Sequence, residues 1–204
     1  MNYIEILKLC TRTDNHESRL WMQSPFHAFG RTFATNGYIM VTVPMVGIYP
    51  DFTEKVAKAY PFQKSMRVSI PLEKIKIELA KYPVEMVYDE LDCDECNGSG
   101  SVTWTYNEYE KDGDCPLCEG HGYFRHPTDK TQINEDSLFK IGVAVYRVGV
   151  IEKLIQVAEL AGYDSIYLVN QGEKDAAIFE IGEIEMLIMP MQTEEKTTIG
   201  EVRL

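Results

Sequence analysis

The sequence predicts an α+β fold, in which two units of one helix followed by antiparallel strands are interrupted by a small cysteine-rich hairpin. Apolar residues recur at helical spacing in two distant segments, residues 3–9 and 150–161. Short runs of aromatic and β-branched residues, separated by turn residues, follow each helical segment. Between the two units, residues 93–122 hold four of the chain's five cysteines.

The first unit opens with a short helix whose apolar residues lie largely on one side: Tyr3, Ile4, Ile6, Leu7 and Leu9. Cys10 ends this stripe and is expected to be a small core residue. Two extended segments follow, "RLWMQSPFHAFG" and "RTFATNGYIMVTVPM". Gly30-Arg31 separates them, and Asn36-Gly37 is expected to form a second turn or a bulge. The segment "DFTEKVAKAYPF" then predicts a short helix that ends before Pro61, because the residue before a proline avoids the helical conformation.

Residues 66–71 alternate as a strand does, whereas residues 72–81 fit either a strand or a helix. The second unit begins with a helix that Gly162 is placed to end. Its apolar face comprises Val150, Leu154, Val157, Ala158 and Ala161. Three strands follow, "SIYLVN", "AAIFEIG" and "IEMLIMPM", so the two halves share one order of elements, as a duplicated unit would.

The composition is that of an ordinary globular chain. The 204 residues are 45% hydrophobic and 25% charged, so a disordered chain is not expected. The N-terminus lacks the basic start and the cleavage site of a secretory signal, and the apolar runs are far shorter than the ~20 residues of a membrane span. We therefore expect a cytoplasmic protein without membrane contact.

The formal net charge of −12 argues against a protein that coats nucleic acid indiscriminately, because phosphate contacts need a positive surface. A local basic face stays open as an alternative to a merely solvated surface. Its members would be Arg31, Lys55, Lys58, Lys64, Arg67, Lys74, Lys76 and Lys81.

Two copies of one pattern, C-x-x-C-x-G-x-G, stand at residues 93–100 and 115–122. Their cysteines are Cys93, Cys96, Cys115 and Cys118. The spacing C-x2-C-x18-C-x2-C predicts a single zinc site, and because four thiolates close the coordination sphere, that zinc is structural. The alternative, a redox pair, needs one motif that opens a helix after a strand. His121 and His126 are expected to be bystanders.

The segment between the cysteine pairs predicts a hairpin stapled by the zinc ion. "SVTWTY" alternates as a strand does, and "KDGD" is expected to supply the turn. We assign the insert to residues 91–126, within a host domain of residues 1–90 and 127–204.

Trp104, Tyr106 and Tyr109 alternate or nearly alternate along the insert and are candidate partner-binding residues. They would stack on bases, grip an extended peptide, or simply cover the metal. Nine acidic residues against three basic ones at 91–130 favour a protein or peptide over DNA. The sequence contains no H-E-x-x-H motif, no phosphate-binding glycine loop outside the zinc knuckles and no G-x-S-x-G elbow, so we expect no enzyme activity.

The two cysteine motifs resemble the CxxCxGxG repeat in the zinc domain of DnaJ chaperones. That family carries four repeats and two zinc ions, whereas this chain has two repeats, spaced like the inner pair that shares one zinc. The resemblance implies one zinc ion here. It does not extend to a J-domain, because Thr128 separates His126-Pro127 from Asp129 and the His-Pro-Asp triplet is absent.

The rest of the chain resembles a domain of the bacterial DNA sliding clamp. "FATNGYIMVTVP" at 33–44 is similar to the clamp's "ATDGHRLA" strand pair, and "AVYRVGVIEKLIQVAELAGYDSIYL" with "MLIMPM" to its last helix-and-strands unit. The resemblance implies sheets outside and helices that face DNA. A clamp subunit has three such domains and this chain has room for one, so a ring would be a homo-oligomer of about six copies.

These observations predict a non-enzymatic zinc-binding interaction protein, a DNA-clamp-like accessory factor in replication or in related phage or mobile-element DNA metabolism. A protein partner is expected, with DNA bound through the clamp-like domain. Two alternatives stay open: a chaperone-like or assembly adaptor that binds extended peptide segments through the zinc hairpin, and an acidic inhibitor that mimics DNA.

Overall fold

The computed structural model describes residues 1–13, 17–57, 64–192 and 198–204. They form two compact units, Met1–Pro83 with Asn134–Leu204, and Val84–Ile133. The predicted α+β class with an inserted hairpin is confirmed, because a few helices accompany many antiparallel strands. Within the described part, no helix is long and apolar enough to span a bilayer.

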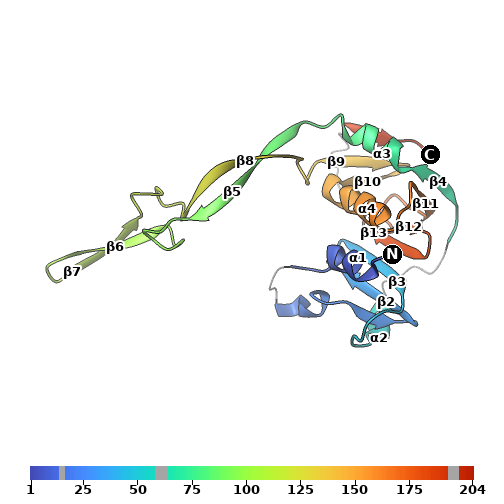
Figure 1. Cartoon of the computed structure of the whole chain (residues 1–204), viewed down its shortest axis with the longest axis horizontal. Coiled ribbons are helices and arrows are strands. Elements are labelled where there is room, and N and C mark those ends of the chain that lie inside the picture. The colour runs from blue at the N-terminus through green and yellow to red at the C-terminus, as the bar shows by residue number, and fades with distance from the viewer. Residues whose placement is uncertain (14–16, 58–63, 193–197) are drawn as a thin grey trace. The chain divides into compact units, whose positions relative to one another are not determined.

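A seven-stranded antiparallel sheet organises the first unit, in the order β1-β2-β3-β13-β12-β11-β4 (Figure 1). Its strands are β1 Phe26–Ala28, β2 Arg31–Thr35, β3 Ile39–Pro44, β4 Val68–Pro71, β11 Ser165–Asn170, β12 Ala177–Ile181 and β13 Ile184–Ile188. The strands of the N-terminal and C-terminal halves meet where β3 pairs with β13, with Val41 opposite Met186, and where β4 pairs with β11. The two halves therefore share one continuous sheet.

A smaller sheet in the order β10-β9-β14 completes the strands of this unit. It comprises β9 Leu138–Ile141, β10 Ala144–Arg147 and β14 Gly200–Val202, and β14 runs parallel to β9. None of these three strands is predicted by the sequence pattern. Each has only three or four residues, too few for alternation to be distinguished from chance.

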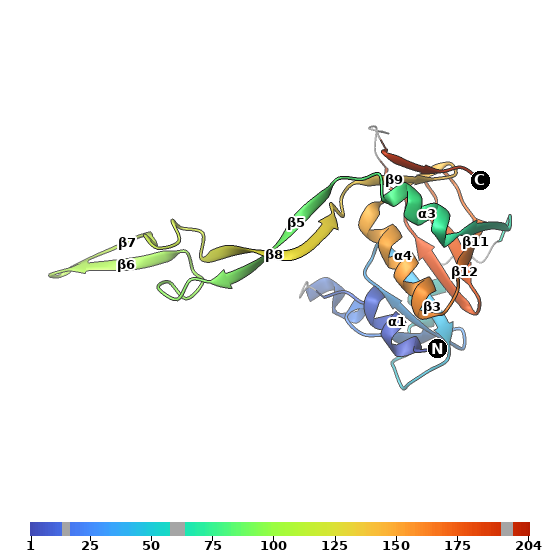
Figure 2. The ribbon, with the colours of Figure 1, turned by 45° about the horizontal axis from the view of Figure 1, so that its top comes forward.

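Helices α1 (Tyr3–Cys10) and α4 (Val148–Leu160) lie side by side against one face of the large sheet (Figure 2). α1 turns Ile6, Leu7 and Cys10 into the core, which confirms the expected core position of Cys10. Gly162, at a φ of 78°, follows α4 as predicted. Each half thus has a helix followed by three strands of the sheet, the predicted order, and β4 is a further strand at the edge beside β11.

The other face of the sheet has a core of its own, in which Phe26, Phe33, Met40, Ile178 and Leu187 pack together. Trp21 and Phe52 pack against this cluster, with ring centroids 5.5 and 5.6 Å from that of Phe26. Both faces of the central strands are therefore covered. That arrangement explains why the first five residues of β3 are all buried, instead of alternating between buried and exposed.

One segment that was expected to be extended begins as a helix, and the segment that fitted either a strand or a helix is helical. Residues Glu17–Met22, at the start of the first expected extended segment, form a 3-10 helix. The ambiguous segment forms α3, Leu72–Leu79, because Leu72, Ile75 and Leu79 are buried at helical spacing. A short helix, α2, covers Thr53–Ala57. Its expected end before Pro61 lies outside the described residues.

The second unit consists of two antiparallel two-stranded ladders. β5 (Val84–Asp92) pairs with β8 (Tyr123–Ile133), and β6 (Ser101–Tyr106) pairs with β7 (Tyr109–Asp114). The expected turn at "KDGD" is wrong, because these residues lie within β7. The chain reverses at residues 107–108, where Asn107 adopts a φ of 55° that asparagine tolerates better than most residues.

Candidate metal centre

The two ladders of the second unit bring the four predicted cysteines together. One pair follows β5, and the other follows β7. Cys93, Cys96, Cys115 and Cys118 are all buried, and their Sγ atoms lie within 4.8 Å of one another. No other group of three or more metal-ligating side chains this close occurs in the described part of the chain.

The spacing of the sulfur atoms fits a single metal ion. Sγ of Cys93 lies 3.8 Å from Sγ of Cys115, and Sγ of Cys96 lies 3.7 Å from Sγ of Cys118. Four sulfurs at about 2.3 Å from a tetrahedral zinc ion are about 3.8 Å apart. A disulfide needs about 2.05 Å, so the cysteines are separate thiols. The donor set fits a closed four-thiolate site with no position left for a substrate.

Each knuckle is tied to the other by a backbone hydrogen bond. The amide of Cys93 donates to the carbonyl of Gly122 at 2.7 Å, and the amide of Cys115 donates to the carbonyl of Gly100 at 2.8 Å. The two bonds connect equivalent positions of the two C-x-x-C-x-G-x-G copies. The repeat in the sequence therefore becomes an approximate two-fold relation between the knuckles.

Backbone amides also point at the sulfur atoms. Gly100 N–H donates to Sγ of Cys96 at 3.3 Å, and Gly122 N–H donates to Sγ of Cys118 at 3.2 Å. Burial by itself raises the pKa of the Cys96 thiol, but the Gly100 amide and the neighbouring cysteines outweigh it, so that the pKa is lowered. At Cys96 this favours the thiolate, which is the form that binds a metal. At Cys93 the backbone amide of Cys96 lowers the pKa, but burial and the thiols of Cys96 and Cys115 outweigh it, so that the pKa of Cys93 is raised instead.

Neither histidine of the insert belongs to the cluster. His121 is exposed, and its ring centroid lies 6.4 Å from that of Tyr123, while His126 is exposed within β8. A half-open groove of about 430 Å³ beside the second knuckle was not foreseen. Its apolar lining includes Leu117, Tyr123 and Phe124. The adjacent aromatic residues Tyr123 and Phe124 are the feature of the sequence that could have indicated this groove.

The three candidate partner-binding aromatics do not cover the metal centre. Val102 is the partly buried apolar residue that packs against the cysteines. Trp104, Tyr106 and Tyr109 are exposed by 55%, 78% and 80%. All three side chains are therefore accessible to solvent.

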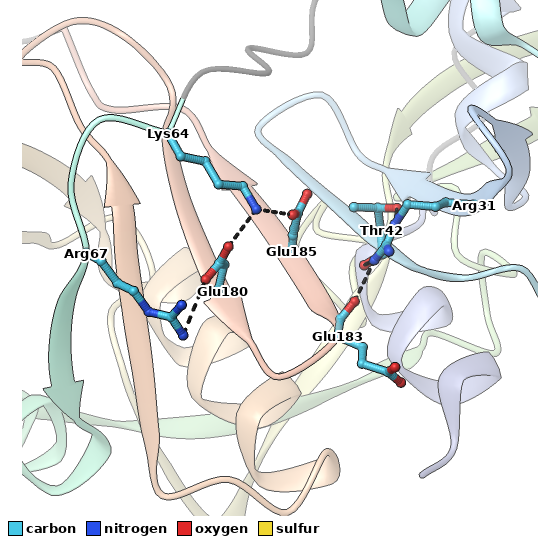
Figure 3. A network of polar contacts seen from close by, with 7 residues as sticks. All are labelled: Arg31, Thr42, Lys64, Arg67, Glu180, Glu183 and Glu185. Atoms are coloured by element: carbon cyan, nitrogen blue, oxygen red, sulfur yellow. Dashed lines mark hydrogen bonds and ion pairs between the residues drawn. The ribbon is translucent and has the colours of Figure 1, made fainter.

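The basic residues considered for a nucleic-acid face contact acidic groups or carbonyls instead. Lys64 Nζ lies 2.6 Å from a carboxylate oxygen of both Glu180 and Glu185 (Figure 3). A guanidinium nitrogen of Arg67 lies 3.8 Å from Glu180. Arg31 donates to the carbonyl oxygen of Glu183 at 2.5 Å.

The other described members of that set behave in the same way. Lys76 pairs with Glu159 at 2.6 Å, and Lys81 pairs with Glu78 at 2.5 Å. Lys74 donates to the carbonyl of Arg203. Lys58 and the side chain of Lys55 lie outside the described residues. A charge-balanced, solvated surface therefore describes these residues better than a basic face does.

No protein-family model matches the sequence, and no curated protein matches it. Among solved structures, the chain is similar to the DNA polymerase III subunit beta from Pseudomonas aeruginosa, with a TM-score of 0.48 and 9% identity. It is also similar to the DNA polymerase sliding clamps from Bacillus subtilis (TM-score 0.47, 11% identity) and Bartonella birtlesii (TM-score 0.46, 11% identity).

Each of these alignments covers 94% of this chain. The covered shares of the Pseudomonas, Bacillus and Bartonella chains are 64%, 62% and 65%, so this chain spans less than two thirds of their length. The likeness is one of fold.

Proposed function

We propose that this chain is a non-catalytic, cytoplasmic, zinc-binding interaction protein, whose second unit is held by one structural zinc ion and binds a protein partner. The observation that carries the proposal is the convergence of four buried cysteines whose sulfur spacing matches a tetrahedral zinc site. A closed thiolate site supplies folding energy rather than a reactive position.

The second unit needs such a metal because it has little else to hold it. The cluster that it buries consists of the four cysteines, with Val102 packed against them. β5 is exposed along almost its entire length. Isolated two-stranded ladders are marginally stable at best, whereas a structural zinc ion contributes on the order of 10 kcal/mol.

X-ray absorption at the zinc edge of the purified protein tests this proposal. Four sulfur neighbours at about 2.3 Å are expected in the wild-type protein and in Cys10→Ser, because Cys10 belongs to the core of the other unit. Cys96→Ser is expected to lose the metal. A zinc spectrum dominated by nitrogen or oxygen neighbours would contradict the site.

A second, finer candidate is a DNA-clamp-like accessory role in replication or in phage or mobile-element DNA metabolism. The continuous sheet with α1 and α4 on one face favours it. The charge on those helices does not favour it, because they carry three acidic residues, Glu5, Glu152 and Glu159, and only two basic ones, Lys8 and Lys153. Sedimentation velocity with and without duplex DNA separates the two candidates, because a clamp-like role requires a closed oligomer that retains DNA.

A further inference from the structure

The β6–β7 hairpin has two chemically different faces. Pairing places Trp104 opposite Lys111 and Tyr106 opposite Tyr109, and side chains alternate between the faces along each strand. One face carries Val102, Trp104, Tyr106, Tyr109, Lys111 and Gly113. The other carries Ser101, Thr103, Thr105, Glu110, Asp112 and Asp114. The first face is aromatic with one lysine, and the second is hydroxyl-rich and acidic.

The aromatic face is a continuous surface. Val102 anchors one end against the cysteine cluster. The indole of Trp104 lies over Gly113, where a β-carbon would be 3.5 Å from Nε1. Tyr106 and Tyr109 flank the turn and are the two most exposed aromatic side chains among the described residues. Large aromatic side chains in this state are typical of recognition surfaces rather than of cores.

The charge of the second unit specifies what this surface attracts. Residues 84–133 contain twelve acidic and three basic residues, a net charge of −9 out of −12 for the whole chain. Four thiolates around a divalent ion add further negative charge. A nucleic acid or a second copy of the unit would be repelled, whereas a cationic segment would be attracted.

The hairpin also offers backbone groups for recognition. β6 and β7 form a two-stranded sheet, so each strand has an outer edge that no described strand pairs with. An extended segment can add to such an edge through main-chain hydrogen bonds while its side chains reach the adjoining face. Arginine and lysine side chains stack favourably on tyrosine and tryptophan rings.

We propose that the aromatic face formed by Trp104, Tyr106 and Tyr109 binds a basic, extended segment of a protein partner. This inference rests on the proposed function, since it names the partner class of the same zinc-held unit. The aromatic rings receive the cationic side chains, and the surrounding carboxylates balance their charge.

Fluorescence anisotropy with the zinc-loaded full chain tests the proposal. The probes are a short labelled peptide that alternates arginine with valine, the same peptide with glutamate in place of arginine, and a single-stranded oligothymidine. The protein variants are Tyr106→Ser with Tyr109→Ser, and Tyr88→Ser as the matched control, because Tyr88 is exposed by 50% in the same unit but lies on β5. Zinc content is measured for every preparation.

The arginine peptide is expected to bind more tightly than the other two probes, and the double variant to weaken its binding at least about tenfold while Tyr88→Ser leaves it unchanged. Equal binding of the glutamate peptide or the oligothymidine overturns the proposal. So does arginine-peptide binding that weakens with salt but is insensitive to the double variant, because charge alone then explains it. If zinc is retained and no probe binds, this inference fails while the metal centre stands. If no zinc is retained, the proposed function itself fails.

Discussion

A β-carbon on Gly100 would lie 2.4 Å from the carbonyl oxygen of Gly120, in the opposite knuckle of the metal centre. That distance is shorter than any side chain tolerates, and Gly100 also adopts a φ of 76°. The equivalent contact of Gly122 with the carbonyl oxygen of Gly98 is 2.5 Å. The last glycine of each C-x-x-C-x-G-x-G copy is therefore required for the two knuckles to meet.

Gly100→Ala is expected to weaken zinc affinity by about 10- to 100-fold, because the clash displaces the amide that donates to Cys96. Gly162→Ala is the matched control, since Gly162 has a similar φ of 78° but nothing within 4 Å of its added β-carbon. It should lose about 1 kcal/mol of stability and no zinc affinity. Competition with a chromogenic chelator measures the zinc affinity of both variants. Equal zinc affinities in Gly100→Ala and Gly162→Ala would be inconsistent with the steric argument.

The cysteine cluster could be predicted from the sequence more completely than the fold, and the reason is local. Metal-ligand spacing and glycines are set by residues close together in the chain, so two short motifs sufficed to name all four cysteines. The turn was misplaced because "KDGD" has turn composition. The pairing of Tyr106 with Tyr109 instead puts the reversal at Asn107. The short strands β9, β10 and β14 depend on contacts between distant segments, which periodicity does not reveal.

Removal of the metal is expected to unfold the second unit and spare the first. The first unit has buried residues on both faces of its sheet, whereas the second buries little besides the cysteines. Hydrogen exchange with and without a chelator should show loss of protection at 84–133 and unchanged protection in β3 and β13. Protection of β6 and β7 that survives chelation would show that the hairpin folds without the metal.

Lys64→Met is expected to destabilise the protein by about 0.5–1 kcal/mol, because Glu180 and Glu185 are directly opposite across β12 and β13 and Lys64 bridges them. Lys81→Met removes a pair of similar exposure and should cost less, because Glu201, the carboxylate near Glu78, stays paired with Lys140 and Arg203. Urea denaturation measures both variants. A loss at Lys64 no larger than that at Lys81 would argue against the bridging role.

Hydrogen bonds to Glu180 and Glu185 raise the pKa of Lys64. A base with a raised folded-state pKa contributes stability that is present below its unfolded pKa and lost as pH rises through the folded value. The difference between wild type and Lys64→Met should therefore persist at neutral pH and shrink in strongly alkaline buffer. Denaturation midpoints at both pH values provide the comparison.

Glu152→Gln is expected to stabilise the protein at pH 7. Desolvation in α4, with a contribution from the nearby Glu135, raises the pKa of Glu152. Because the folded-state pKa is raised, ionisation of Glu152 lowers the stability of the folded protein as pH rises from the unfolded pKa through the folded pKa. Below the unfolded pKa the carboxyl group is neutral in both states, so the gain from the glutamine should disappear there. Thermal unfolding across this pH range measures it, and a gain that is independent of pH would point to a cause other than charge.

Native mass spectrometry of the full chain, before and after chelation, shows whether the four cysteines hold a zinc ion. We expect one zinc ion per chain that survives gentle ionisation, is removed by the chelator and is absent from Cys96→Ser but present in Cys10→Ser. The same spectrum reports the number of subunits, which separates a closed ring from a monomer or dimer. A wild-type chain that carries no metal would show that the four cysteines do not form a zinc site.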